Sequence, residues 1–133
     1  MSPPISDLPL LLRSLEPVLN PGTFVFTSVR DAAEIEANAI IASIREPEGL
    51  SLVMSEPDAL RRGLPILFRA AWITLTVSSD LAAVGLTAAF ASALGAAGIS
   101  CNVVAGAYHD HIFVPADSSE RALLELRKLS DGP

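Results

Sequence analysis

The sequence predicts an α+β protein in which an antiparallel sheet carries its helices on one face. Three observations favour this fold class. Residues 72–78 alternate between apolar and polar side chains, as a half-buried strand does. Residues 82–98 have the apolar spacing of a helix. Residues 99–129 then give two strand-like runs and an amphipathic helical run, so the second half of the chain has the order β-α-β-β-α.

This order is the ferredoxin-like βαββαβ pattern without its last strand. The central helix carries Leu86, Phe90 and Leu94 at a spacing of four, and Gly98 ends it. The strands are expected at 99–105 and 108–115. A sheet that lacks an edge strand needs a donor, and the N-terminal strands or a second subunit are the two alternatives.

The final helix is expected over 117–129. Asp117 is a candidate N-cap with Glu120 three residues later, and Ala122, Leu126 and Leu129 form a core stripe. Together these elements predict one continuous apolar core beneath the sheet in the second half of the chain.

The first half gives weaker signals. Leucines at helical spacing behind Ser6 predict a short helix, and Pro17, Pro21 and Gly22 predict a turn. Strands are expected at 23–29, 39–46 and 50–54, with a surface loop at 30–38 and a hairpin turn at "PEG". Ser55 is the expected N-cap of a helix that Gly63 ends. We expect two related units, residues 1–68 and 69–133.

Composition limits the classes of function. Half of the residues are apolar, 18% are charged, and the net charge is −6 without a run of basic residues. Nucleic acid and anionic membrane surfaces are therefore poor candidate partners, because both require a basic face. The single cysteine, Cys101, fits a reducing compartment, and we expect a cytoplasmic protein with a buried, inert thiol.

One long uncharged stretch, 81–108, raises the question of a membrane span. Its apolar residues form a stripe on one face, and glycines interrupt it, which favours a buried helix of a globular domain. The first residues of the chain, 1–12, carry Asp7 and no basic residue before their apolar run, so they lack the basic start of a signal peptide. P-loop, GxSxG and CxxC motifs are absent from the sequence, so the common nucleotide, hydrolase and redox signatures are missing.

The run "SSDLAAVGLTAAFASALGAAGISCNVVAG" (78–106) resembles an ACT domain, a small regulatory module that binds amino acids. Aspartokinase regulatory domains use a very similar run. With "REPEGLSLV" and "YHDHIFVP", the whole chain further resembles small stand-alone bacterial ACT proteins that have a degenerate ACT-like N-terminal half. The resemblance implies a regulatory, commonly dimeric protein that binds a small ligand and has no catalytic activity or cofactor. No enzyme is attached here, however, and ACT folds also serve dimerisation alone.

The resemblance maps the ligand site onto Asp80, Val84, Gly85, Leu86 and Asn102. The residues themselves agree in part: a glycine turn lets the backbone approach a ligand, and N–H groups at a helix start favour a carboxylate. Asp80 has an alternative role as N-cap of the helix that follows. Acceptors for the ammonium group of an amino acid are Asp110, Asn102 or main-chain carbonyls.

Both histidines lie in "AYHDHIFVPA" (107–116). On a strand, His109 and His111 point to one face and Asp110 to the other, so the three cannot converge on one ion without a bulge. A zinc site needs a third or fourth ligand, and the chain has no other histidine. Contact with a ligand or partner and a purely structural role stay open, and a histidine-dependent metalloenzyme is the weakest alternative.

Overall fold

The computed structural model describes residues 7–31, 33, 35–76 and 85–131. Its elements follow the chain as α1 (Leu8–Ser14), β1 (Pro17–Val29), the 3-10 turn η2 (Ala37–Ala39), β2 (Ala42–Glu46), β3 (Gly49–Ser55), α2 (Glu56–Arg61), β4 (Phe68–Leu75), α3 (Leu86–Ala96), β5 (Asn102–Ala105), β6 (Asp110–Pro115), the 3-10 turn η3 (Ala116–Ser118) and α4 (Ser119–Asp131).

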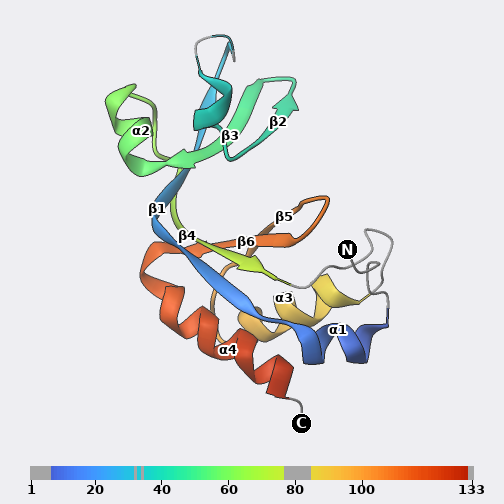
Figure 1. Cartoon of the computed structure of the whole chain (residues 1–133). Helices are drawn as coiled ribbons and strands as arrows, with labels where there is room; N and C mark the ends of the chain where they lie inside the picture. Colours follow the sequence, from blue (N-terminus) through green and yellow to red (C-terminus); the bar gives the residue numbers. More distant parts are fainter. Residues whose placement is uncertain (1–6, 32, 34, 77–84, 132–133) are drawn as a thin grey trace.

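The six described strands form a single antiparallel sheet in the order β2-β3-β1-β4-β6-β5. The two long central strands, β1 and β4, run through both halves of the molecule (Figure 1). Helices α1, α3 and α4 cover the lower half of the sheet in this view, whereas α2 lies beside the upper half. The α+β class and the antiparallel sheet with helices on one face are confirmed.

The strand that the C-terminal unit lacks comes from the same chain. Residues Pro17–Asn20 of β1 pair with Trp72–Leu75 of β4, while Phe24–Val29 pair with β3. The order β1-β4-β6-β5 therefore completes a ferredoxin-like unit in which β1 takes the place of the missing last strand. Of the two donors expected, the N-terminal half supplies the strand.

The N-terminal half has the same strand order around the same two central strands. Its elements run β1, η2, β2, β3, α2 and β4, and its part of the sheet is β2-β3-β1-β4. Where a βαββαβ unit has its first helix, the described residues between β1 and β2 hold the three-residue turn η2 and no α-helix. This half is therefore a degenerate copy of the C-terminal unit, and the two copies share β1 and β4.

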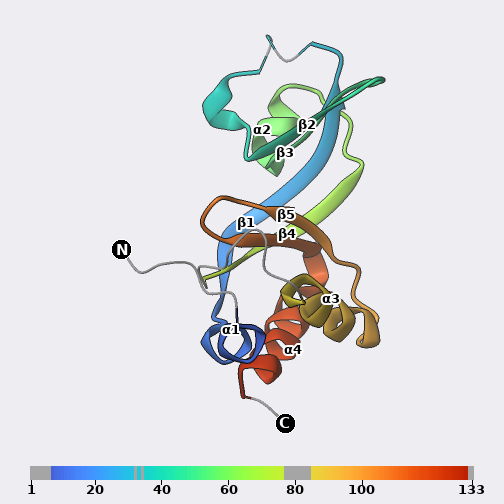
Figure 2. The ribbon, with the colours of Figure 1, turned by 90° about the vertical axis from the view of Figure 1, so that its right-hand side faces the viewer.

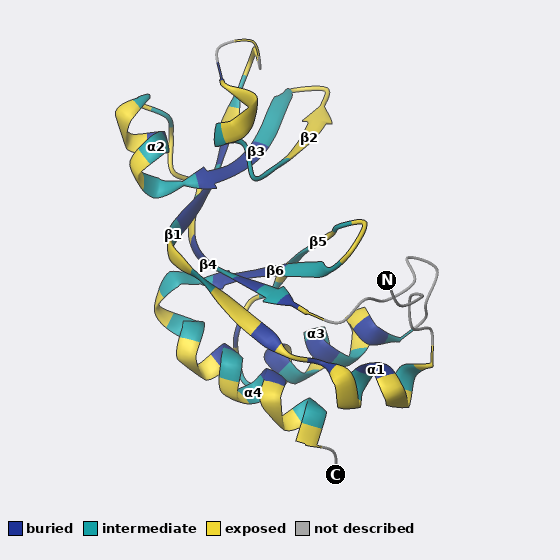
Figure 3. Ribbon diagram, viewed as in Figure 1, coloured by how far each residue is buried: buried dark blue, intermediate teal, exposed yellow. Residues whose placement is uncertain are grey.

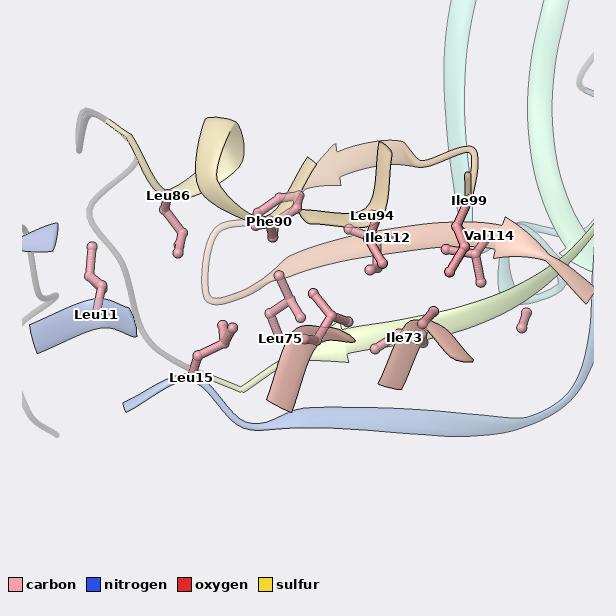
Figure 4. Close-up of a cluster of buried hydrophobic side chains, with 13 residues drawn as sticks. Leu11, Leu15, Ile73, Leu75, Leu86, Phe90, Leu94, Ile99, Ile112 and Val114 are labelled. Carbon is pink, nitrogen blue, oxygen red and sulfur yellow. The ribbon is translucent and has the colours of Figure 1, made fainter. Parts of the chain in front are cut away.

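The main core lies between the sheet and helices α1, α3 and α4 (Figure 4). Leu86, Phe90 and Leu94 of α3 are buried on one side of the helix, as their spacing predicts. They pack in one cluster with Ile73 of β4 and Ile112 of β6. Figure 3 shows this buried layer between the sheet and the exposed outer faces of the helices.

A second group of apolar residues lies on the opposite, helix-free face of the sheet. Phe24 meets Trp72 edge-on at a centroid distance of 5.2 Å, and Phe26 meets Phe113 edge-on at 5.4 Å. Edge-to-face pairs of this kind stabilise beyond the area that they bury. The two faces of the sheet thus have different chemistry: aliphatic beneath the helices and aromatic on the open side.

The predicted turn at Pro17, Pro21 and Gly22 is wrong, because β1 continues through all three residues. Its register against β4 shifts between Asn20 and Phe24, and this irregularity accommodates Pro21 and Gly22. Proline cannot donate to a regular ladder, and a bulge is one of the few places in a sheet that accept it.

Several element ends also differ from the prediction. Asp7, not Ser6, caps α1, since its carboxylate accepts a hydrogen bond from the Leu10 N–H. The fourth strand starts at Phe68 rather than at residue 72 and ends at Leu75; residues 77 and 78 lie outside the described residues. The second and third predicted strands start at Ala42 and Gly49, and the last two at Asn102 and Asp110. The chain after Pro115 begins with η3, so Asp117 lies inside this turn and is not an N-cap.

Candidate functional site

The expected ligand site involves one end of the C-terminal unit. There β4 ends, β6 begins and α3 starts, and Figure 1 shows these three points on the same side of the lower half. Leu75 at the end of β4 pairs with Asp110 at the start of β6. Figure 2 gives the view from this side. Of the predicted site residues, Asp80 and Val84 lie outside the described residues.

Helix α3 begins at Leu86, and residues 82–84 of the predicted helix lie outside the described residues. Gly85 is its N-cap, has a left-handed φ of 102°, and gives the helix no side-chain capping hydrogen bond. A Cβ atom at Gly85 would come within 2.9 Å of Leu8 Cδ2, so α1 packs directly against this turn. The cap of α3 is thus Gly85, and Asp80, the expected alternative, lies outside the described residues. First-turn N–H groups without a side-chain cap are suited to an anionic ligand.

Leu86 and Asn102 do not reach this end with their side chains. Leu86 is 3% exposed and belongs to the main core. Asn102 pairs with Phe113, whereas Asp110 pairs with Ala105, so they lie three positions apart along the β5–β6 hairpin. At the rise of a strand this is about 10 Å.

Asp110 is half-buried on the helix-covered side, where its neighbour Leu75 is part of the core. Within the described residues, the carboxylate of Asp110 has no ion-pair or hydrogen-bond partner. Burial raises the pKa of its carboxyl group above the ordinary value of 3.8, and the positive charge available on His111 and His109 opposes this rise. An unpaired, partly desolvated carboxylate attracts a cation more strongly than a solvated one does.

His109 lies beside Asp110 in the chain, at the end of the β5–β6 turn. Its main-chain carbonyl accepts a hydrogen bond of 2.9 Å from the Gly106 N–H. Its Nδ1 atom is buried and has no partner among the described residues. A buried ring nitrogen without a partner is costly unless something outside the described contacts satisfies it.

His111 lies on the opposite face, in contact with the aromatic group. Its Nδ1 accepts a hydrogen bond of 3.0 Å from Trp72 Nε1 and lies 3.2 Å from Thr74 Oγ1. Asn20 donates in turn to Thr74 Oγ1 at 3.0 Å. Burial, and to a smaller extent the charge of His109, lower the pKa of His111, while Asp110 acts in the opposite direction.

The alternation predicted for this strand is confirmed from Asp110 onward, whereas His109 precedes β6. His111 and Phe113 lie on the aromatic face, and Asp110 shares the other face with Ile112 and Val114. Among the described residues, no group of three or more His, Cys, Asp or Glu side chains is placed to hold a metal ion. His111 is instead part of a hydrogen-bonded group drawn from β1, β4 and β6.

Cys101 lies just before β5 and packs against the main core. Burial raises the pKa of its thiol, which lowers the fraction of reactive thiolate. The side chain is partly buried rather than buried as expected, and the raised pKa agrees with an inert thiol.

Two ACT-domain family models match the chain, one over residues 3–71 and the other over residues 68–128. The chain belongs to the ACT domain family. The two matches overlap only at 68–71, the start of β4, which is one of the two strands that both ACT units share. No protein of curated function matches the chain.

The ACT chain is also similar to solved structures. A protein of unknown function from Vibrio cholerae, described as a possible transport protein, is 46% identical, with 92% of this chain and 95% of that chain covered and a TM-score of 0.83. An Agrobacterium tumefaciens protein is 19% identical (87% and 89% covered, TM-score 0.66). The ligand-free regulatory subunit of Thermus thermophilus aspartate kinase is 12% identical (86% and 97% covered, TM-score 0.61). The last two share the fold.

Sequence reasoning missed Trp72, Thr74 and Asn20 as partners of a histidine. The alternation of residues 72–78 does place Thr74 on the polar side of its strand, which was a usable signal. Asn20 had none, because it stands in a stretch whose prolines favoured a turn. None of the helices in the described part of the chain combines the length and the apolar character needed to span a bilayer.

Proposed function

We propose that this ACT protein is a non-catalytic regulatory sensor whose ligand is a small amino-acid-like molecule. The ligand binds at the end of the C-terminal unit, with its carboxylate at the start of α3 and its ammonium group at Asp110. Asp110 carries the proposal: it is a half-buried carboxylate without a cationic partner among the described residues. An ammonium group would supply that missing charge.

The uncapped start of α3 supports the carboxylate end of the ligand. Gly85 leaves the first-turn N–H groups without a side-chain acceptor, and the helix dipole adds positive potential there. The buried Nδ1 of His109 is a further polar group available to a ligand. The aspartate kinase regulatory subunits that share the fold are consistent with a regulatory role.

Asn102 and the side chain of Leu86 are left out of this site within one chain, because of their positions. In a homodimer, Asn102 of a second copy is available to the site, since it lies on the edge strand β5. We include a homodimer in the proposal, and light scattering tests it: a monomer at all concentrations would remove this part.

The alternative of a ligand-free dimerisation module rested on the edge left by a missing strand. β1 fills that position within the chain, and β2 and β5 remain the two edges of the sheet.

Thermal-shift measurements with each standard amino acid at millimolar concentration test the proposal. We expect at least one to raise the melting temperature of the wild-type protein, and calorimetry to show saturable binding. Asp110→Asn should abolish this effect while the protein stays folded, because the amide keeps the shape and removes the charge. Asp131→Asn, the same change at an exposed position in α4, should bind as the wild type does. No stabilisation by any amino acid would refute the sensor function.

A further inference from the structure

A groove lies on the open side of the sheet, between its two edge strands. It has a volume of about 390 Å³, and its walls are Ala42–Ile44 of β2 and Val103–Ala105 of β5. Phe26 and Val53 contribute to its floor. Because β2 and β5 are the first and last strands of the sheet, the twist of the sheet has brought its own two edges to face each other.

A smaller cavity of about 50 Å³ adjoins this groove. Ala42 and Val104 line both spaces, and the smaller one reaches Trp72, His111 and Phe113. The groove therefore leads inward to the aromatic group on the helix-free face. Since the chain has a single tryptophan, Trp72 is a built-in fluorescent reporter for whatever enters.

Main-chain groups of β5 point into the groove. The Gly106 N–H donates to the His109 carbonyl across a two-residue turn, which makes these residues a hydrogen-bonded pair. Hydrogen-bonded pairs recur at every second position of an antiparallel ladder, so Val104 is such a pair with His111. Val103 and Ala105 consequently direct their N–H and C=O groups away from β6, towards the groove.

The same alternation applies to β2. Glu46 and Gly49 pair across the two-residue turn of the β2–β3 hairpin, so Ile44 and Ala42 are the residues that bond to β3. Ser43 and Arg45 then direct their main-chain groups outward. Ser43 lines the groove, and Arg45 does not. Outward main-chain groups therefore come from Val103 and Ala105 on one wall and from Ser43 on the other.

Exposed sheet edges in proteins are normally protected by lysine, proline or an inward-pointing charge. Neither wall of this groove carries any of these, and its lining has no charged side chain. Figure 3 shows β2 as an exposed strand, and Ile44 is 64% exposed. The walls are thus built like strands that have a partner.

We propose that this groove binds an extended, uncharged peptide segment of another protein, which adds a strand to both edges of the sheet. An extended main chain is the chemistry that satisfies outward N–H and C=O groups on two facing walls. The three residues on each wall span about 10 Å, so a segment of about three to five residues fits. Alternate side chains of the segment point to the apolar floor, which favours valine, isoleucine or threonine at every second position.

A second copy of this chain does not fit the groove in a symmetric pair. Two copies that meet through this patch alone would face groove to groove across the twofold axis, and one concave groove cannot fill another. The occupant is therefore a protruding or unfolded segment. This site is separate from the amino-acid site at Asp110, which lies on the helix-covered face.

The probe is the blocked peptide acetyl-Thr-Val-Thr-Val-Thr-amide, titrated into the full-length protein with Trp72 emission as the readout. Its control is the same peptide with two main-chain nitrogens methylated, which keeps the side chains and removes donors. We expect saturable binding of the parent, binding weakened at least about tenfold by methylation, and amide shifts in NMR spectra at Ser43, Val103 and Ala105.

Two proline variants test the edge itself. Ser43→Pro removes an outward N–H without removing a bond to β3, and we expect it to weaken binding at least about tenfold. Arg45→Pro makes the same change on the same edge, outside the groove lining, and should bind like the wild type. Circular dichroism establishes that both variants fold.

Three results would overturn the proposal. One is equal binding of the methylated and parent peptides, which would indicate a pocket for small apolar molecules. Another is the absence of binding at millimolar peptide to a folded protein. The third is a wild-type dimer that Ser43→Pro dissociates and Arg45→Pro does not, which would assign the edge to a second copy.

Discussion

The indole N–H of Trp72 donates a hydrogen bond of 3.0 Å to Nδ1 of His111 and ties β4 to β6 on the helix-free face. An indole nitrogen is a donor only, so Nδ1 of His111 must be the unprotonated nitrogen of the ring. Neutral His111 therefore carries its proton on Nε2. Burial lowers the pKa of His111 below 6.5, with a smaller contribution from His109, which favours the same neutral form.

Replacing Trp72 with phenylalanine should raise the pKa of His111. The change removes a donor that stabilises the neutral ring and keeps an aromatic side chain in place. NMR titration of the imidazole protons measures the midpoint, and unfolding in urea should show a loss of about 1 kcal/mol. Phe24→Leu is the control, because it alters the ring packed against Trp72 and leaves the hydrogen bond. An unchanged midpoint in Trp72→Phe would show that the bond does not set the tautomer.

His111 should also make the folded protein less stable in mild acid. Its pKa is lower in the folded state than the ordinary 6.5, so below pH 6.5 the unfolded chain binds more protons. His111 does not lower the free energy of unfolding above pH 6.5. This free energy decreases as the pH falls from 6.5 towards the folded-state pKa of His111. His111→Gln should remove this slope in a series of urea unfolding curves. The same slope in the variant would assign it to another group.

Asp110→Asn should raise stability at neutral pH. Burial raises the pKa of Asp110 above 3.8, so the folded protein binds this proton more tightly than the unfolded chain does. Its ionisation therefore reduces stability as the pH rises through the folded-state pKa, and above that pH the reduction persists. The melting temperature is the measurement, and Asp131→Asn, at an exposed position, should leave it unchanged. Increased stability together with lost amino-acid binding would be the stability–activity trade-off of a functional site.

Gly85→Ala should destabilise the protein by about 1–3 kcal/mol, because φ is 102° and the added methyl group meets Leu8 at 2.9 Å. Leu8→Ala in the same chain should relieve the contact but not the backbone strain, so the double variant should recover part of the loss. Gly95→Ala in the same helix, where a Cβ meets nothing within 4 Å, should stabilise by up to about 1 kcal/mol. Equal effects at the two glycines would contradict the close packing of α1 against this turn.

The sequence predicts the C-terminal unit well because its signals are local. Each signal depends on residues close in the chain. These signals are Gly98 just after the end of α3, the spacing of Phe90 and Leu94, and the alternation around Ile73. The first half depends on distant pairing. Pro21 and Gly22 have turn chemistry, yet pairing of β1 with β4 on either side holds them in an extended strand.

The candidate site divides in the same way. The glycine turn at Gly85 and the face of Asp110 follow from spacing alone. The separation of Asn102 from Asp110 follows from the register of the β5–β6 hairpin, which the sequence does not specify to within a residue. The facing of β2 and β5 across a groove depends on the twist of the whole sheet, and no local pattern encodes it.

The shared central strands should make the two ACT units unfold as one. Met54 is buried under α2 and Phe90 under the lower half of the sheet, and β1 and β4 run between these regions. Met54→Ala should lower the unfolding free energy by about 2–5 kcal/mol and Phe90→Ala by about 3–5 kcal/mol.

Both variants should shift one common unfolding transition, because neither unit keeps its sheet without β1 and β4. Hydrogen exchange at the amides of β3 and of α3 measures the two regions separately. Leu124→Ala, at an exposed position of α4, should change the free energy by less than about 0.5 kcal/mol. Two transitions that Met54→Ala and Phe90→Ala move independently would show that each half is stable alone.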